Sequence, residues 1–116
     1  MFLDHNVIND LGRDTFQHNN KLGRIDLSHN QLEVLHESLF ENNDELSSIN
    51  LSYNELTVIP LGLFNHLANL KHLRLNHNKL MIIPDGAFQA TTVLDQLYLE
   101  ENLLETARWL EFLFSK

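Results

Sequence analysis

Residues 70–80 read LKHLRLNHNKL. The same arrangement of leucine and asparagine returns along the chain every 24 residues, without insertion or deletion. The columns that hold one kind of residue are Leu22, Leu46, Leu70 and Leu94; Ile25, Ile49, Leu73 and Leu97; Leu3, Leu27, Leu51, Leu75 and Leu99; Asn6, Asn30, Asn54, Asn78 and Asn102; and Phe16, Phe40, Phe64, Phe88 and Phe112. A period of this length indicates a solenoid, in which each repeat buries its apolar face against its neighbours.

The residue types within one repeat indicate how it folds. In Leu73-Arg74-Leu75 the leucines alternate with a polar residue, which is typical of a strand with one buried face. Asn78 follows this strand, and a buried asparagine needs partners for both its donor and its acceptor. We therefore predict that the repeated asparagines bond to the backbone of neighbouring turns as a ladder, and that the phenylalanines close the core from behind the strands.

The composition agrees with a solenoid and limits the possible partners. The 24 leucines and 14 asparagines make up about a third of the 116 residues. The net charge of −8, without a cluster of Lys and Arg, disfavours binding to nucleic acid or to an anionic membrane surface. No apolar run approaches the roughly 20 residues that span a bilayer. Because there is no cysteine, disulfides and thiolate chemistry are excluded.

The unit Leu-x-x-Leu-x-Leu-x-x-Asn-x-Leu resembles the leucine-rich repeat family. The resemblance implies an α/β solenoid, a right-handed horseshoe segment with short parallel strands on the concave face and irregular or 3-10 segments on the convex side. It divides residues 1–116 into a partial repeat 1–21 and repeats 22–45, 46–69, 70–93 and 94–116. Met1 falls in a core column halfway through a repeat, and no polar cap precedes the first strand. We therefore expect a fragment of a longer array.

The turns and the C-terminal segment carry further signals. Pro60 and Pro84 share a column and should rigidify the turn into the back of the repeat, and Gly62 and Gly86 should ease it. Residues 105–112 fit a fifth back segment. Leu104, Ala107, Leu110 (or Glu111) and Phe114 also fit a helical spacing, and we favour an amphipathic terminal helix that covers the end of the stack.

The variable positions between the strand leucines should point away from the core and form the concave face. They are Asp4, His5, Gly23, Arg24, Asp26, Ser28, His29, Ser47, Ser48, Asn50, Ser52, Tyr53, Lys71, His72, Arg74, Asn76, His77, Asp95, Gln96, Tyr98, Glu100 and Glu101. Among these we predict the following partner-binding residues: Arg24, Asp26, His29, Asn50, Tyr53, His72, Arg74, His77, Tyr98 and Glu100. Tyrosine and arginine are favoured as interface anchors.

The charges on this face allow two interpretations. Lys71, His72, Arg74 and His77 form a basic row, and Asp95, Glu100 and Glu101 form an acidic row beside it. The two rows can pair with each other and give a self-balanced, solvated surface. Alternatively, they form a polar contact patch anchored by tyrosines.

One column holds His5, His29, Tyr53, His77 and Glu101. We do not expect a metal site, because a flat column interrupted by Tyr53 does not bring three or four ligands to one point. A pH response is a second hypothesis, since protonated histidines would add positive charge to one face near pH 6.

Asn50-Leu51-Ser52 is the only N-glycosylation pattern, and Asn50 is a possible site if the protein is secreted. No signature of catalysis or of a cofactor is present, so we expect neither an enzyme nor a cofactor.

The 24-residue spacing with a Phe in each back segment is similar to that of Toll-like receptor ectodomains and insect adhesion and immune proteins. The resemblance implies an extracellular or cell-surface module that recognises a protein or a pattern molecule. An intracellular scaffold or regulatory subunit is the alternative, which the absence of cysteine and of a signal peptide favours. A third possibility is a spacer that binds nothing itself.

Overall fold

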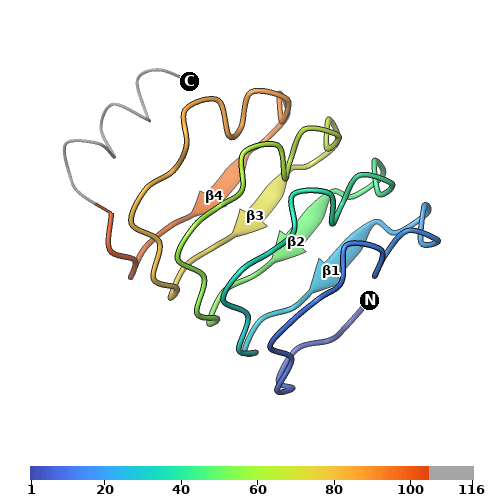
Figure 1. Ribbon diagram of the computed structural model, residues 1–116. Coiled ribbons are helices and arrows are strands. Elements are labelled where there is room, and N and C mark those ends of the chain that lie inside the picture. Colours follow the sequence, from blue (N-terminus) through green and yellow to red (C-terminus); the bar gives the residue numbers. More distant parts are fainter. Residues whose placement is uncertain (105–116) are drawn as a thin grey trace.

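The protein folds as a stack of parallel strands connected by long return segments (Figure 1). The computed structural model describes residues 1–104. Strands β1 (Arg24–Asp26), β2 (Ser48–Asn50), β3 (His72–Arg74) and β4 (Gln96–Tyr98) form one sheet in sequence order. This arrangement confirms the predicted solenoid with short parallel strands.

The 24-residue period fixes the register of the sheet. Ile25 pairs with Ile49, Ile49 with Leu73, and Leu73 with Leu97, so that each strand places its central apolar residue beside its neighbour's. The partial first repeat joins the same sheet, because Phe2 forms an isolated parallel bridge with Asp26. Leu3 there occupies the column of the strand leucines and packs against the core.

The repeated asparagines form the predicted ladder. The Oδ1 atom of Asn54 accepts a hydrogen bond from the backbone N–H of Leu32 at 3.1 Å. Its Nδ2 atom donates to the carbonyls of Leu27 and Leu51 at 3.0 and 3.2 Å. Equivalent bonds are made by Asn30, Asn78 and Asn102. Each side chain therefore links the backbones of two successive repeats and leaves its polar atoms satisfied in the interior.

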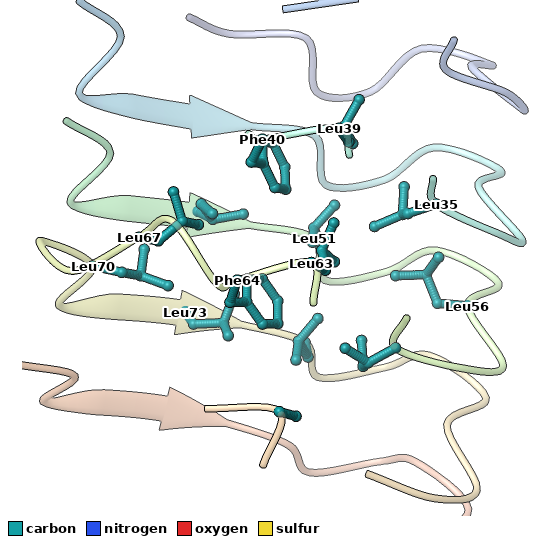
Figure 2. Packing of buried hydrophobic residues seen from close by; sticks show 14 of the residues in the cluster. Leu35, Leu39, Phe40, Leu51, Leu56, Leu63, Phe64, Leu67, Leu70 and Leu73 are labelled. Atoms are coloured by element: carbon teal, nitrogen blue, oxygen red, sulfur yellow. The ribbon is translucent and has the colours of Figure 1, made fainter. Parts of the chain in front are cut away.

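The apolar columns meet behind the strands as one continuous core (Figure 2). Phe16, Phe40 and Phe64 are fully buried, and the strand leucines face them across the interior. The ring of Phe16 stacks on that of Phe40 with centroids 6.1 Å apart. Phe64 and Phe88 stack in the same way at 5.6 Å. Repetition of one ring per turn therefore fills the back of the core, as the sequence predicts.

The return segments are built from tight turns, and residues 1–104 contain no helix. In this part of the chain there is accordingly no helix that could span a bilayer. The N–H of Leu63 donates to the carbonyl of Pro60 at 3.1 Å, and Gly62 has a φ of 98°. A glycine with positive φ at the third position of such a turn avoids the clash that a side chain would cause. The predicted terminal helix lies outside the described residues.

Asn43 is a structural residue that the sequence analysis did not identify. It is fully buried in a return segment, and its Nδ2 atom donates to the carbonyls of Phe16 and Asn19, both at 3.0 Å. Its column also holds Asn19, Leu67 and Thr91, so an asparagine stands there in the first two repeats only. A column of mixed residue types does not predict a buried position.

Candidate interaction face

The solvent side of the sheet forms the concave face, where the candidate binding residues lie. In each strand the central residue points into the core and the two flanking residues point outward. Arg24, His29, Tyr53, Arg74 and Glu100 are exposed. The five other predicted residues are half-buried: Asp26, Asn50, His72, His77 and Tyr98. All ten therefore present some surface to a partner.

Two pairs of polar side chains on this face bond to each other. Ser28 donates its backbone N–H and its hydroxyl to Oδ1 of Asp26, at 2.9 and 2.6 Å. Ser52 makes the same two bonds to Oδ1 of Asn50, at 3.1 and 2.6 Å. The prediction that both serines are surface residues was wrong, since each is only 4% exposed. The hydrogen bond to the carboxylate of Asp26 or to the amide of Asn50 keeps each serine hydroxyl away from solvent.

The Asn50–Ser52 pair therefore has a structural role that is independent of glycosylation. Asp26 and Ser28 make the same bonds one repeat earlier, where no glycosylation pattern exists. The sequence pattern at Asn50 is thus explained by the strand end itself, and its use for a glycan stays a prediction.

The third repeat lacks such a pair. Arg74 stands in the column of Asp26 and Asn50, and its guanidinium carbon lies 5.1 Å from the ring centroid of Tyr98. A guanidinium over an aromatic face is a favourable contact. Two further polar atoms of this repeat are buried and have no hydrogen-bond partner within the protein, Nδ1 of His72 and Oδ1 of Asn76.

The basic and acidic rows do not pair with each other. Within residues 1–104 the ion pairs are Asp4 with His5, at 2.8 Å, and Lys79 with Glu55, at 2.6 Å. Arg24, Lys71 and Arg74 belong to neither. The structure therefore does not have the self-balanced surface that ion pairs between the two rows would give.

A ladder of stacked rings runs along one margin of the concave face. Its members are His5, His29, Tyr53 and His77, which we call the ring ladder. Successive centroids are 4.2, 4.3 and 4.3 Å apart, and the planes deviate by at most 12°. In the sequence, Tyr53 interrupts a column of histidines. The structure shows that its ring continues the stack between two imidazoles.

The backbone explains this alignment. Each ring-ladder residue has a φ between 56° and 58°, in the left-handed region that non-glycine residues rarely enter. The same conformation in successive repeats, in register, sets the rings face to face. Glu101 has a φ of 59° and occupies the same place in the next repeat.

Two charged contacts shift ionisation at the edge of this face. The hydrogen bond from the His5 ring lowers the pKa of the Asp4 carboxyl below its ordinary value. The hydrogen bond to Glu55 raises the pKa of Lys79. Elsewhere, no three His, Asp or Glu side chains of the described residues gather in a group that could hold a metal ion.

Phe2 belongs to the concave face but was not predicted. Its side chain is 84% exposed, and its backbone pairs with Asp26 at the first edge of the sheet. It lies 24 residues before Asp26, so the repeat period could have placed it there.

The chain belongs to the leucine-rich repeat family, because the family described as "Leucine rich repeat" matches residues 1–56 and 44–104. No curated protein matches the chain.

Solved leucine-rich repeat structures superpose closely on this chain. The leucine-rich repeat domain of APL1B is 28% identical with a TM-score of 0.86, and the alignment covers 88% of this chain and 30% of that one. TLR13, in a complex with the RNA ssRNA13, is 27% identical with a TM-score of 0.85, over 90% of this chain and 15% of that one. An internalin (inlF) of Listeria monocytogenes is 20% identical with a TM-score of 0.76, over 92% of this chain and 29% of that one, and shares the fold. This chain thus spans less than a third of each of these chains.

The TLR13 complex bears on one expectation. That protein is seen with an RNA, so the comparison gives no support to the exclusion of nucleic acid that the charge suggests.

Proposed function

We propose that the chain is a recognition segment that binds another protein through its concave face. The observation that carries this proposal is the set of cationic and aromatic side chains on that face, of which Arg24, Lys71 and Arg74 have no ion-pair partner among residues 1–104. The in-register sheet and the asparagine ladder hold these side chains at fixed spacing. A rigid surface loses little entropy when a partner binds.

An extracellular or cell-surface setting is part of this proposal. Similarity to the leucine-rich repeat domains of APL1B and TLR13 supports it. An intracellular scaffold is the alternative. Glycan analysis of the protein secreted from eukaryotic cells tests whether Asn50 is used, with Asn50→Gln as the control: a mass loss after endoglycosidase treatment that is absent from Asn50→Gln supports a secreted protein.

Binding through the concave face is tested with two triple variants. The first carries Tyr53→Ala, Arg74→Ala and Tyr98→Ala. The matched control carries Glu41→Ala, Asn65→Ala and Gln89→Ala, three exposed residues that share one column of the return segments. A purified partner, found by crosslinking to the immobilised protein, is then measured by surface plasmon resonance. We expect a loss of affinity of about 100-fold for the first variant and little change for the control.

Equal affinity of the concave-face variant and the unmodified protein would overturn the proposal. Single-stranded RNA is the competing ligand, because TLR13 is seen with one. Binding of RNA that weakens steeply as salt rises, with no protein partner, would replace the protein-binding function by an RNA-binding one.

A further inference from the structure

We propose that the β3–β4 half of the concave face is a subsite for an acidic segment of a protein partner, with a Glu or Asp carboxylate bound by Arg74. The inference rests on the proposed function and assigns it a position and a ligand chemistry. It follows from an asymmetry between the two halves of the sheet.

The β1–β2 half satisfies its own polar groups. In Asp26 and Asn50, Oδ1 accepts two hydrogen bonds from the serine two residues later. These bonds fix the side chains against the strand ends. A ligand that docked here would have to compete with short bonds of 2.6 Å between the side chains. The cation of this half without an ion-pair partner among residues 1–104 is Arg24, and the same strand carries the anionic Asp26.

The β3–β4 half has the opposite character. Arg74 and Asn76 occupy the columns of the Asp26–Ser28 and Asn50–Ser52 pairs, but they do not bond to each other. Nδ1 of His72 and Oδ1 of Asn76 are buried without a hydrogen-bond partner, on either side of Arg74 in the chain. Buried polar groups are nearly always paired in folded proteins, so this repeat, unlike the two before it, does not satisfy all of its own polar groups.

Arg74 is positioned for a carboxylate. Its guanidinium lies over the ring of Tyr98, and the hydroxyl of Tyr98 is 3.4 Å from Oε1 of Gln96. Within residues 1–104 no hydrogen bond or ion pair occupies the N–H donors of this guanidinium. Those donors match the two oxygens of a carboxylate in a bidentate pair.

The surrounding charges decide where an acidic group can sit. Lys71 precedes β3 and adds a positive charge, and His72 lies in β3, whereas Ser48 and Asn50 on the adjacent β2 are neutral. Asp95, Glu100 and Glu101 flank β4 and repel an anion, and Asp26 does so at β1. The carboxylate therefore lies at the guanidinium of Arg74, between β3 and β4, and the parts of the segment that pass Asp95, Glu100 and Glu101 are neutral or basic.

The subsite is tested by NMR titration of the isotope-labelled chain. The probe is a capped peptide with two glutamates between glycines, and its control has glutamines at the same places. We expect the glutamate peptide alone to shift the Nε–H resonance of Arg74 and the ring resonances of His72 and Tyr98. Arg74→Gln should weaken this binding by about 10-fold or more, whereas Arg13→Gln, at an exposed arginine of a return segment, should change it less than about 2-fold.

Three results would overturn the subsite: equal shifts with the glutamine peptide, an equal loss in Arg13→Gln, or a stronger response to a phosphoserine peptide or to single-stranded RNA. Thermal unfolding of both variants confirms that they are folded. Loss of a protein partner in the Tyr53, Arg74 and Tyr98 triple variant, with equal affinity for Arg74→Gln and Arg13→Gln, would leave concave-face binding standing and remove the subsite alone.

Discussion

At the scale of single residues, the asparagine column shows why a leucine could not replace each asparagine. A leucine has a similar volume and would suit the apolar interior, but the chain turns sharply after each strand and leaves backbone groups without a strand partner. Asn54 meets the N–H of Leu32 and the carbonyls of Leu27 and Leu51. The side chain therefore replaces the hydrogen bonds that a regular sheet would have supplied.

Asn54→Ala should be among the most destabilising single changes. It leaves the buried N–H of Leu32 without its partner, and the carbonyls of Leu27 and Leu51 keep only their bonds from Asn30 and Asn78. We expect the free energy of unfolding to fall by about 2–3 kcal/mol. Asn42→Ala, at an exposed asparagine of a return segment, is the control and should cost less than about 0.5 kcal/mol. Urea denaturation followed by circular dichroism measures both. Similar midpoints for the two variants would refute the structural role of the ladder.

The Asp4–His5 contact predicts a small pH dependence of stability. Because the pKa of the Asp4 carboxyl is lower in the folded chain than in the unfolded chain, the ionised form stabilises the fold. This contribution is present above about pH 4 and is lost as the pH falls through the folded-state pKa. The unfolding midpoint of the unmodified protein should therefore fall between pH 5 and pH 3. In Asp4→Asn this fall should be smaller, because the variant has no carboxylate to protonate at position 4. An unchanged pH profile would contradict this origin.

At the scale of the element, a repeat consists of a three-residue strand followed by a residue with positive φ. The strand sets the register, and the positive φ turns the next side chain so that it lies flat against its equivalent in the neighbouring repeat. Planar rings in this geometry stabilise the fold, because stacking contributes free energy in addition to that of burial. The ring ladder is therefore a consequence of backbone conformation, with side chains suited to it.

Two substitutions of Tyr53 separate ring stacking from hydroxyl chemistry. Tyr53→Phe keeps the stack on His29 and His77 and should leave the free energy of unfolding nearly unchanged. In Tyr53→Ala the residue must still adopt a positive φ, but both ring contacts are lost. We expect the free energy of unfolding to fall by about 1–2 kcal/mol. Chemical denaturation of the two variants checks this difference. An equal cost in both would mean that the hydroxyl, and not the stack, stabilises the margin of the concave face.

At the scale of the whole molecule, the period of the sequence was sufficient to predict the sheet, its register and the asparagine ladder. These features depend on columns that repeat in every turn. What the sequence did not predict depends on particular contacts that do not recur in every repeat. Within one repeat, Asp26 and Asn50 bury Ser28 and Ser52. Between repeats, the buried Asn43 bonds to the backbone of Phe16 and Asn19. The continuity of the ring ladder through Tyr53 depends on a backbone conformation that side-chain patterns do not display.

A stack whose repeats contact only their neighbours should respond to core changes according to position. Leu73 and Leu97 share one column, but Leu73 is fully buried between β2 and β4, whereas Leu97 is half-buried. Leu73→Ala should lower the free energy of unfolding by about 3–4 kcal/mol, since the neighbouring backbones cannot collapse into the cavity. Leu97→Ala removes the same atoms with less loss of burial, so its cost should be about half as large. Denaturant unfolding of the two variants measures the difference, and hydrogen exchange locates it: in Leu73→Ala protection should fall on both sides of β3. Equal costs would indicate a single cooperative core in place of a sum of nearest-neighbour contacts.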